Sequence, residues 1–193
     1  NPQVLEATED DFPTLGRKLL EDRAGIHLSI TSPINLLQEI FTVKGAGTVF
    51  RKGSLICSGS AEPDRLMSLL KESFQREPVA TVLDAVSCSY YEENYRGAVL
   101  LEETPVGLYL SKFAVGPEAR GEGLAQELWV EVCDRHTSFF WRSRIGNPVN
   151  TWYDRKADGY YTTDEWVVFW RGMSPEALPG LISFCDARRS DFK

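Results

Sequence analysis

The stretch GLYLSKFAVGPEARGEGLAQELWVEVCDRH, residues 107–136, decides the fold class, because an apolar strand pattern runs through a glycine-containing loop into an amphipathic helix pattern. Gly121 and Gly123 let the backbone of this loop turn so that successive N–H groups point into one concavity. The helix that follows adds the free donors of its first turn and the positive end of its dipole. The loop therefore predicts a nest for a pyrophosphate, with a plain strand-to-helix turn as the alternative.

Strand and helix patterns flank this unit on both sides. Upstream, helices are expected at 13–22, 33–42 and 62–74, and β-rich runs at 80–91 and 96–103 are separated by the polar EENY of a hairpin. Downstream follow a strand at 138–144, a short helix or turn at 150–157, a strand at 165–172 and a last helix within 175–189. This order predicts an α/β (α+β) fold with a central, mostly antiparallel mixed sheet flanked by helices.

Composition narrows the ligand class. The chain has 193 residues, with 21 Lys+Arg against 28 Asp+Glu and a formal net charge of -7. That balance disfavours a nucleic-acid or anionic-membrane surface, so a cluster of cations is expected to serve a small anion. The four cysteines are scattered without a CxxC pair, which favours free thiols while leaving disulfides open. Only two histidines are present, so no histidine-rich metal site is expected.

Arg142 and Arg144 lie two residues apart in FFWRSRIGNPVNTWY, residues 139–153. On a strand such residues share a face at roughly 6.5 Å, where two guanidinium groups would repel each other. An anion beside them removes the difficulty, and guanidinium forks match carboxylates in bidentate geometry. A dicarboxylate needs more than one cationic contact. The alternative is an exposed strand face on which both arginines are simply solvated.

Two sets of motifs carry a resemblance to known proteins. The pattern Arg-x-x-Gly-x-Ala, Arg120 to Ala125, follows a strand and resembles the acetyl-CoA loop of the GCN5-related N-acetyltransferase superfamily. With YLSKFAV upstream and FFWRSRIGNPVNTWY…DG…W…FW downstream, the chain is similar to the acetyltransferase domain of vertebrate-like N-acetylglutamate synthases and of bacterial bifunctional synthase/kinases. The similarity is strong over 106–170, includes the linker-like 32–53 and is loose over 77–105.

The resemblance implies a GCN5-related N-acetyltransferase fold with splayed strands, acetyl-CoA as co-substrate, no metal, and transfer of acetyl to the α-amino group of L-glutamate in arginine biosynthesis. Strand amides would polarise the thioester carbonyl, and loop amides would bind the pyrophosphate. The implied acetyl-CoA residues are Phe113, Ala114, Val115, Arg120, Gly121, Gly123, Leu124 and Ala125.

The same resemblance implies a glutamate site and a proton donor. The substrate-binding set is Arg76, Lys112, Arg142, Arg144 and Asn147. Lys112 could equally be an exposed strand residue. Tyr153 is the candidate acid for the departing thiolate, unless TWYDRK only buries its aromatic rings. The general base stays open between Glu102, Glu103 and a water chain. Cys133, in mid-helix, is expected to be a packed thiol.

For domain organisation we expect residues 1–45 to be a helical segment or linker from an upstream kinase-like domain and 46–193 to be the N-acetyltransferase domain. The start at Asn1 suggests a fragment of a longer protein. The resemblance implies homo-oligomers, and cytoplasm in a bacterium or the mitochondrial matrix in a eukaryote. Two alternatives remain: a non-catalytic regulatory domain of an acetylglutamate kinase, and an acetyltransferase for another acidic amino acid.

Overall fold

The computed structural model describes residues 27–30, 32–35, 48–51 and 53–193 and divides the chain into two compact units, 1–53 and 54–193. In the first unit β1 (His27–Ile30) pairs antiparallel with β2 (Thr48–Arg51), and Pro33–Asn35 form a 3-10 turn. The helix expected at 13–22 and most of the one at 33–42 lie outside the described residues. The division at Gly53 falls later than the expected boundary after residue 45.

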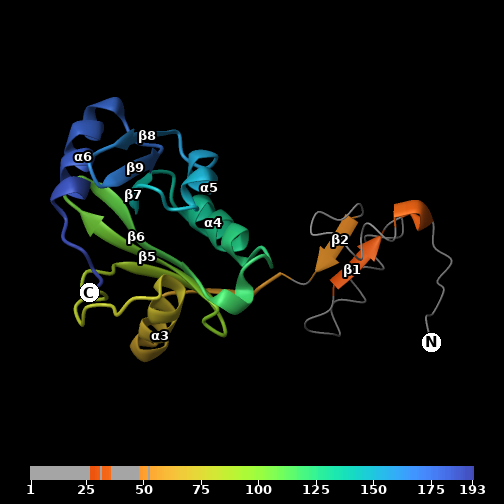
Figure 1. The fold of residues 1–193 in the computed structure, drawn as a ribbon. Helices are drawn as coiled ribbons and strands as arrows, with labels where there is room; N and C mark the ends of the chain where they lie inside the picture. The colour runs from red at the N-terminus through yellow and green to blue at the C-terminus, as the bar shows by residue number, and fades with distance from the viewer. Residues whose placement is uncertain (1–26, 31, 36–47, 52) are drawn as a thin grey trace. The chain divides into compact units, whose positions relative to one another are not determined.

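The second unit is built on a seven-stranded sheet in the order β3-β4-β5-β6-β7-β9-β8 (Figure 1). Its strands are β3 (Ile56–Ser58), β4 (Cys88–Glu92), β5 (Gly97–Thr104), β6 (Gly107–Val115), β7 (Phe139–Arg144), β8 (Gly159–Thr162) and β9 (Trp166–Arg171). Every neighbouring pair is antiparallel except β6 and β7, which are parallel. The predicted α/β fold with a mostly antiparallel mixed sheet is confirmed.

Helices cover both faces of this sheet (Figure 1). They are α3 (Pro63–Phe74), α4 (Leu124–Arg135), α5 (Asn150–Asp154) and α6 (Leu178–Ala187). On α4 the side chains of Leu124, Leu128 and Val132 recur every four residues and are buried against β5 and β7. On the opposite face α3 packs on β5 and β6, and α6 packs on β6, β7 and β9.

The single parallel pair opens the sheet. β6 and β7 share one registered pair, Tyr109 with Phe140, although both strands continue beyond it. The register between β5 and β6 shifts at this point, because Leu100 lies opposite Lys112 whereas Leu101 lies opposite Leu110. One residue of β6 is therefore extra, and such a bulge bends its strand. The expected splay of two central strands is confirmed.

The prediction of a strand at 80–91 is wrong for the first half of that range. Residues before Cys88 form successive turns, with hydrogen bonds from the amides of Val82, Asp84 and Val86 to carbonyls three residues earlier. Val82 is buried against α3, so the apolar run that suggested a strand is explained by packing. Two short edge strands, β3 and β8, were not expected.

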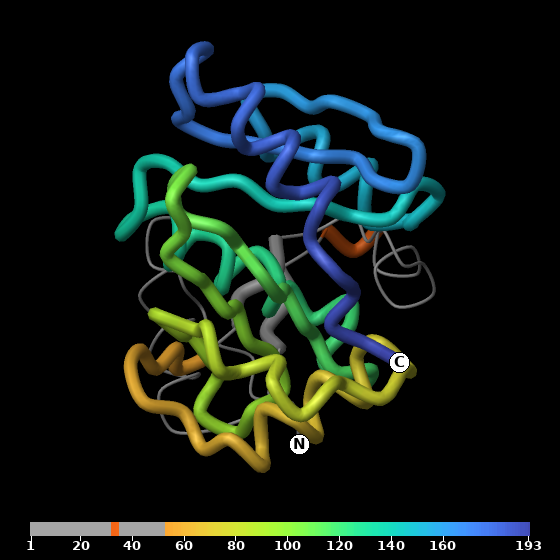
Figure 2. Tube along the Cα trace, turned by 90° about the vertical axis from the view of Figure 1, so that its left-hand side faces the viewer, coloured from red at the N-terminus to blue at the C-terminus, as the bar shows by residue number. Residues whose placement is uncertain are grey.

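The last residues of the chain run from α6 back towards the segment after α3 (Figure 2). Phe192 forms a β-bridge with Pro78, and the amide of Val79 donates to the Asp191 carbonyl at 3.0 Å. The chain end is thereby held beside β6. Among the described residues no helix is long and apolar enough to span a membrane, and none of their His, Cys, Asp and Glu side chains cluster to hold a metal ion.

Candidate active site

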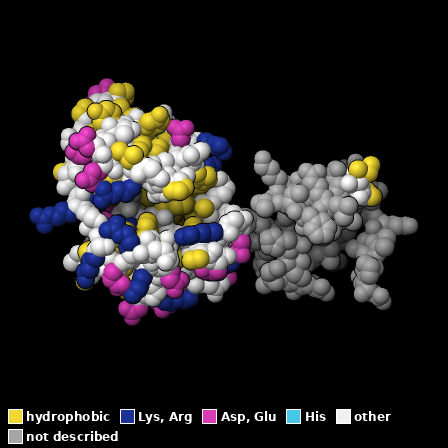
Figure 3. Space-filling view, in the orientation of Figure 1, with side chains coloured by type: hydrophobic (Ala, Val, Ile, Leu, Met, Phe, Trp, Pro, Cys, Tyr) yellow, Lys and Arg dark blue, Asp and Glu magenta, His cyan; other side chains and the backbone are white. Residues whose placement is uncertain are grey.

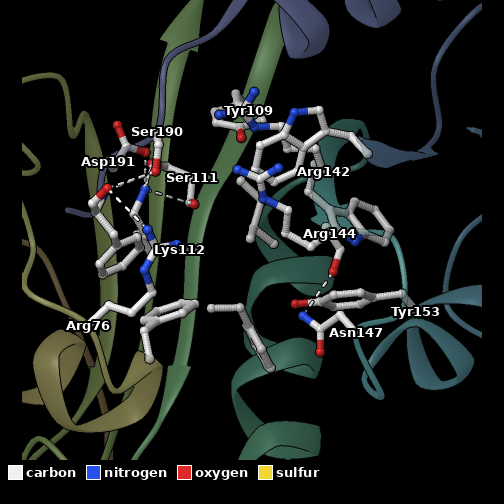
Figure 4. Close-up of a pocket in the computed structure, with 17 residues that line it drawn as sticks. Arg76, Tyr109, Ser111, Lys112, Arg142, Arg144, Asn147, Tyr153, Ser190 and Asp191 are labelled. Carbon is white, nitrogen blue, oxygen red and sulfur yellow. Dashed lines mark hydrogen bonds and ion pairs between the residues drawn. The ribbon is translucent and has the colours of Figure 1, made fainter. Parts of the chain in front are cut away.

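A pocket lies where β6 and β7 diverge, and all of the predicted substrate and acid residues line it. They are Arg76, Lys112, Arg142, Arg144, Asn147 and Tyr153. In Figure 4, Arg76 and Lys112 lie on one side with Ser190 and Asp191, while the others lie across the gap. Figure 3 shows that several Lys and Arg side chains lie around the middle of one face of this unit. An acidic chain thus concentrates cations at one cavity.

Arg142 and Arg144 share one face of β7, as their spacing predicts. Both guanidinium groups lie over the Trp166 ring, at 3.8 and 4.0 Å from its centroid. Arg142 also donates to the carbonyls of Cys185, Arg188 and Arg189, the last two at 2.7 and 2.9 Å. Arg144 forms an exposed ion pair with Glu165 at 2.5 Å. These protein groups therefore relieve the repulsion between the two cations. An anion in the pocket would have to compete with the exposed Glu165 carboxylate for Arg144.

Lys112 is buried in the pocket wall rather than exposed, with 4% of its surface accessible. Its ammonium donates to Asp191 Oδ2 at 2.5 Å and to Ser111 Oγ at 2.9 Å. Burial lowers the pKa of Lys112, and the Asp191 carboxylate acts in the opposite direction. Arg76, which follows α3, donates from Nη2 to the Lys193 carbonyl at 3.0 Å. These two cations are held against the C-terminal segment.

Tyr153 lies on α5 and points its hydroxyl towards the gap between the strands (Figure 4). Its ring packs against Trp141 and Phe169 with centroids 5.4 and 5.6 Å away. Neither the Tyr153 hydroxyl nor the indole Nε1 of Trp141 has a hydrogen-bond partner within residues 54–193. Burial raises the pKa of the Tyr153 phenol, so this donor keeps its proton well into alkaline solution. Ring burial and a free donor are thus both present, and the two readings of TWYDRK are compatible.

Asn147 follows β7 and is oriented by its own loop. Its Nδ2 donates to Ser143 Oγ at 3.1 Å, and its Oδ1 accepts from the amide of Val149 at 3.3 Å. The amide group lines the pocket in this orientation. It can therefore present a polar group to a ligand without a rearrangement of the loop.

The loop before α4 has the geometry of an anion nest. Gly121 and Gly123 have φ of 85° and 84°, in the left-handed region that side chains rarely adopt. Gly123 is the N-cap of α4, and the amides of Leu124 and Ala125 in its first turn find no acceptor within 54–193. Arg120 donates from Nη2 to the Ser73 carbonyl at 3.0 Å, which fixes it at the end of α3. The predicted pyrophosphate loop is thus structurally suited to its proposed ligand.

The three predicted amides of β6 differ in direction. The Gly116 amide donates to the Arg96 carbonyl at the end of the β5–β6 ladder. Because amide groups alternate in direction along a strand, the Ala114 amide points towards β5 and the Phe113 amide points away from it. The Val115 amide donates to Ser73 Oγ at 3.1 Å. Of the three, the Phe113 amide is the one directed towards the opening beside β7.

Comparison with known proteins decides the family. The family model described as the N-acetyltransferase of N-acetylglutamate synthase matches residues 51–187. The chain belongs to this N-acetyltransferase family. It is 38% identical over 152 residues to an acetylglutamate kinase of Xylella fastidiosa, covering 76% of this chain and 36% of that protein. It is 35% identical over 156 residues to the mitochondrial N-acetylglutamate synthase of Danio rerio, covering 75% and 30%.

This N-acetyltransferase-family chain therefore spans about a third of the length of the curated relatives it matches. Among solved structures, N-acetylglutamate synthase from Neisseria gonorrhoeae complexed with coenzyme A and L-arginine is similar with a TM-score of 0.44. The two are 16% identical, and the match covers 83% of this chain and 48% of that one.

The two candidate general bases, Glu102 and Glu103, do not line the pocket. Glu102 is buried and held by both Nη atoms of Arg188, at 2.7 and 2.8 Å. Its carboxylate is thus paired with Arg188 at a place that does not line the pocket. Glu103 is exposed on β5, and neither residue lines the pocket. The structure thus removes both from contact with the predicted site.

Sequence reasoning missed several residues of the pocket wall. Trp166 and Tyr109 were included only as members of strands, although each faces the cavity. Ser190, Asp191 and Phe192 were not considered at all. RRSDFK carries no motif, and its position depends on pairing with residues 77–79 far away in the chain. Only the folded chain reveals this contribution.

Proposed function

We propose that this chain transfers acetyl from acetyl-CoA to the α-amino group of L-glutamate, giving N-acetyl-L-glutamate and CoA. The observation that carries the proposal is the convergence of Arg76, Lys112, Arg142 and Arg144 on one cavity that also holds the Tyr153 hydroxyl. Four cations suit a substrate with two carboxylates, because charge-assisted hydrogen bonds are about twice as strong as neutral ones. Family membership and the names of the relatives support the same reaction.

Acetyl-CoA would enter along the opening between β6 and β7. Its pyrophosphate fits the amides at the start of α4, where Gly121 and Gly123 leave the backbone accessible. The thioester carbonyl would accept a hydrogen bond from the Phe113 amide, which stabilises the oxyanion that forms on attack. This refines the expected role of the amides near Ala114, since that residue is turned towards β5.

Acyl transfer then needs a proton for the departing thiolate. The Tyr153 hydroxyl is a donor without another partner among residues 54–193, and its raised pKa keeps it protonated. The amine attacks the thioester carbon directly. All four cysteines are free. Cys133 is half-buried on α4, Cys185 is buried on α6, and neither lines the pocket.

The wider arrangement is proposed from the relatives. Several of them are named acetylglutamate kinase, and this chain covers about a third of their length, which supports a covalently linked N-terminal kinase-like domain. Homo-oligomers of the whole protein, and cytoplasm or mitochondrial matrix according to the organism, are proposed on the same ground. The relatives include bacterial proteins and proteins named mitochondrial.

The testing experiment is release of CoA thiol from acetyl-CoA, scanned across the amino acids. We expect L-glutamate to give the highest kcat/KM. A preference for another acidic amino acid would replace the substrate but keep the reaction. Binding of acetyl-CoA without release of thiol would instead indicate a non-catalytic regulatory domain.

A further inference from the structure

Asp191 supplies the only carboxylate among the 17 residues that line the pocket. The other charged residues of this wall are Arg76, Lys112, Arg142 and Arg144. Cations explain how carboxylates of a ligand are held, but they repel an ammonium group. An amino acid binds with its α-ammonium beside its α-carboxylate, and a carboxylate is the strongest acceptor that a site can offer to that ammonium.

The position of Asp191 is fixed by the backbone on both sides of it. Its carbonyl accepts from the Val79 amide at 3.0 Å, and the Lys193 amide donates to Glu77 at 3.0 Å. The ring of Phe192 packs on Phe74 with centroids 4.7 Å apart. The side chain of Asp191 is 22% exposed and contacts Lys112 on the same side of the cavity. This carboxylate is therefore built into the site.

The partner of Asp191 is one of the predicted substrate cations. Lys112 Nζ lies 2.5 Å from Asp191 Oδ2, so the two groups form a pair at the place where a carboxylate of the ligand would arrive. When that carboxylate takes hydrogen bonds from Lys112, the adjacent ammonium comes close to Asp191. The pair thus presents one cation and one anion to the two ends of a zwitterion.

We propose that Asp191 receives the α-ammonium of the acceptor amino acid and removes its proton, which makes it the general base of the acetyl transfer. This inference rests on the proposed function and names the acceptor that the sequence left open. A protonated amine has no lone pair for attack, whereas a neutral amine is a good nucleophile.

The proposed reaction is balanced in protons and electrons without another reactant. One proton passes from the ammonium to Asp191 and then to solvent, and the nitrogen lone pair forms the new N–C bond. The C–S bond breaks, and the thiolate takes a proton from Tyr153. The nitrogen loses its second proton as the amide forms, and that proton restores the Tyr153 phenol through solvent. The products are the N-acetyl amino acid, CoA thiol and one released proton.

Several charged or titratable groups lie near Asp191 and would influence the pH dependence of the proposed reaction. They are Lys112 and Tyr109 of β6, Arg188 at the end of α6, Glu102 of β5 behind Arg188, and Arg76 after α3. The nearest of these are cations, with Arg188 Nη2 3.6 Å from Asp191 Oδ1. A ligand carboxylate that takes hydrogen bonds from Lys112 would free Asp191 Oδ2 for the ammonium beside it.

The test is Asp191→Asn in the whole chain, assayed with acetyl-CoA and L-glutamate from neutral to alkaline pH. Asparagine keeps the size of the side chain and one acceptor oxygen, but it carries no negative charge and is not a base. We expect kcat to fall about 10²-fold near neutrality, the low end for general base catalysis. The deficit should shrink as the pH approaches the pKa of the substrate's own ammonium, because free amine then needs no acceptor. Asp191→Glu, which keeps the carboxylate, should restore part of kcat.

The matched control is Glu103→Gln, which removes an exposed carboxylate on β5 outside the pocket and should leave the kinetics unchanged. A lower KM for glutamate with kcat preserved in Asp191→Asn would overturn the inference, since Asp191 would then only compete for Lys112. Unchanged kinetics, or a deficit equal at all pH values, would overturn it as well. If the unaltered protein does not acetylate glutamate, the proposed function itself fails.

Discussion

Replacing Tyr153 with Phe removes one hydroxyl and leaves every ring contact in place. The ring packs against Trp141 and Phe169, and these contacts do not involve the oxygen. Because that hydroxyl faces the pocket and has no partner within residues 54–193, its loss leaves no polar group unsatisfied. We therefore expect the free energy of unfolding to change by no more than about 0.5 kcal/mol, as for other changes that remove no contact.

The kinetic effect should be much larger than the effect on stability. Without the phenol, the thiolate leaves with no donor beside it, and kcat should fall about 10²-fold, which corresponds to about 2.7 kcal/mol in the barrier. Both KM values should move little, because the lost interaction is made in the transition state. In the unaltered protein the raised pKa of Tyr153 keeps the donor protonated, so kcat should show no loss from its ionisation below the usual tyrosine pKa of about 10.

Steady-state kinetics on Tyr153→Phe, with a thermal melt beside it, make the comparison. The matched control is Tyr160→Phe, which removes an exposed hydroxyl on β8 outside the pocket. A Tyr153→Phe protein with normal kcat and a normal melt would refute the acid role and leave Tyr153 as a core residue. A fall in kcat that is matched by Tyr160→Phe would refute it equally.

Three further changes probe other parts of the site and its support. Arg144→Ala should lower kcat/KM for glutamate by about one to two decades with the acetyl-CoA KM little changed; an intact glutamate dependence would return Arg144 to an exposed strand face. Gly123→Val places a branched side chain at φ 84° in the proposed pyrophosphate nest, so calorimetry should show much weaker acetyl-CoA binding. The control Gly59→Ala carries similar backbone strain at φ 111° away from the loop, and equal binding losses in the two would contradict the nest. Arg188→Gln leaves the buried Glu102 without its ion pair and should lower the free energy of unfolding by about 3–5 kcal/mol in a denaturant titration; a change below 1 kcal/mol would be contrary to that.

The elements around the glycine loop before α4 could be predicted because local patterns determine them. Leu124, Leu128 and Val132 mark the buried face of α4 at helical spacing, and Gly123 ends the loop where a left-handed residue is required. Arg142 and Arg144 share a face because side chains alternate along a strand. Backbone periodicity and glycine conformation carry this information within a few residues, so one sequence suffices.

The remaining features depend on contacts between distant segments. The short edge strands β3 and β8 have only three and four residues, too few for a periodic signal. The apolar run around Val82 looks like a strand, yet packing against α3 holds it in turns. Asp191 enters the pocket through pairing of the chain end with residues 77–79, and the ion pair of Glu102 requires the end of α6. Neither contact has a local sequence pattern.

The central claim is that the cationic pocket between β6 and β7 acetylates glutamate, and one competition experiment tests it most directly. The chain is incubated with acetyl-CoA and an equimolar mixture of the amino acids. The acetylated products are identified by mass spectrometry, and the released CoA thiol is quantified in the same samples. The account predicts that N-acetyl-L-glutamate is the dominant product, formed in equal amount with CoA. A folded chain that binds acetyl-CoA but yields no acetylated glutamate, or that acetylates a neutral or basic amino acid in preference, would contradict it.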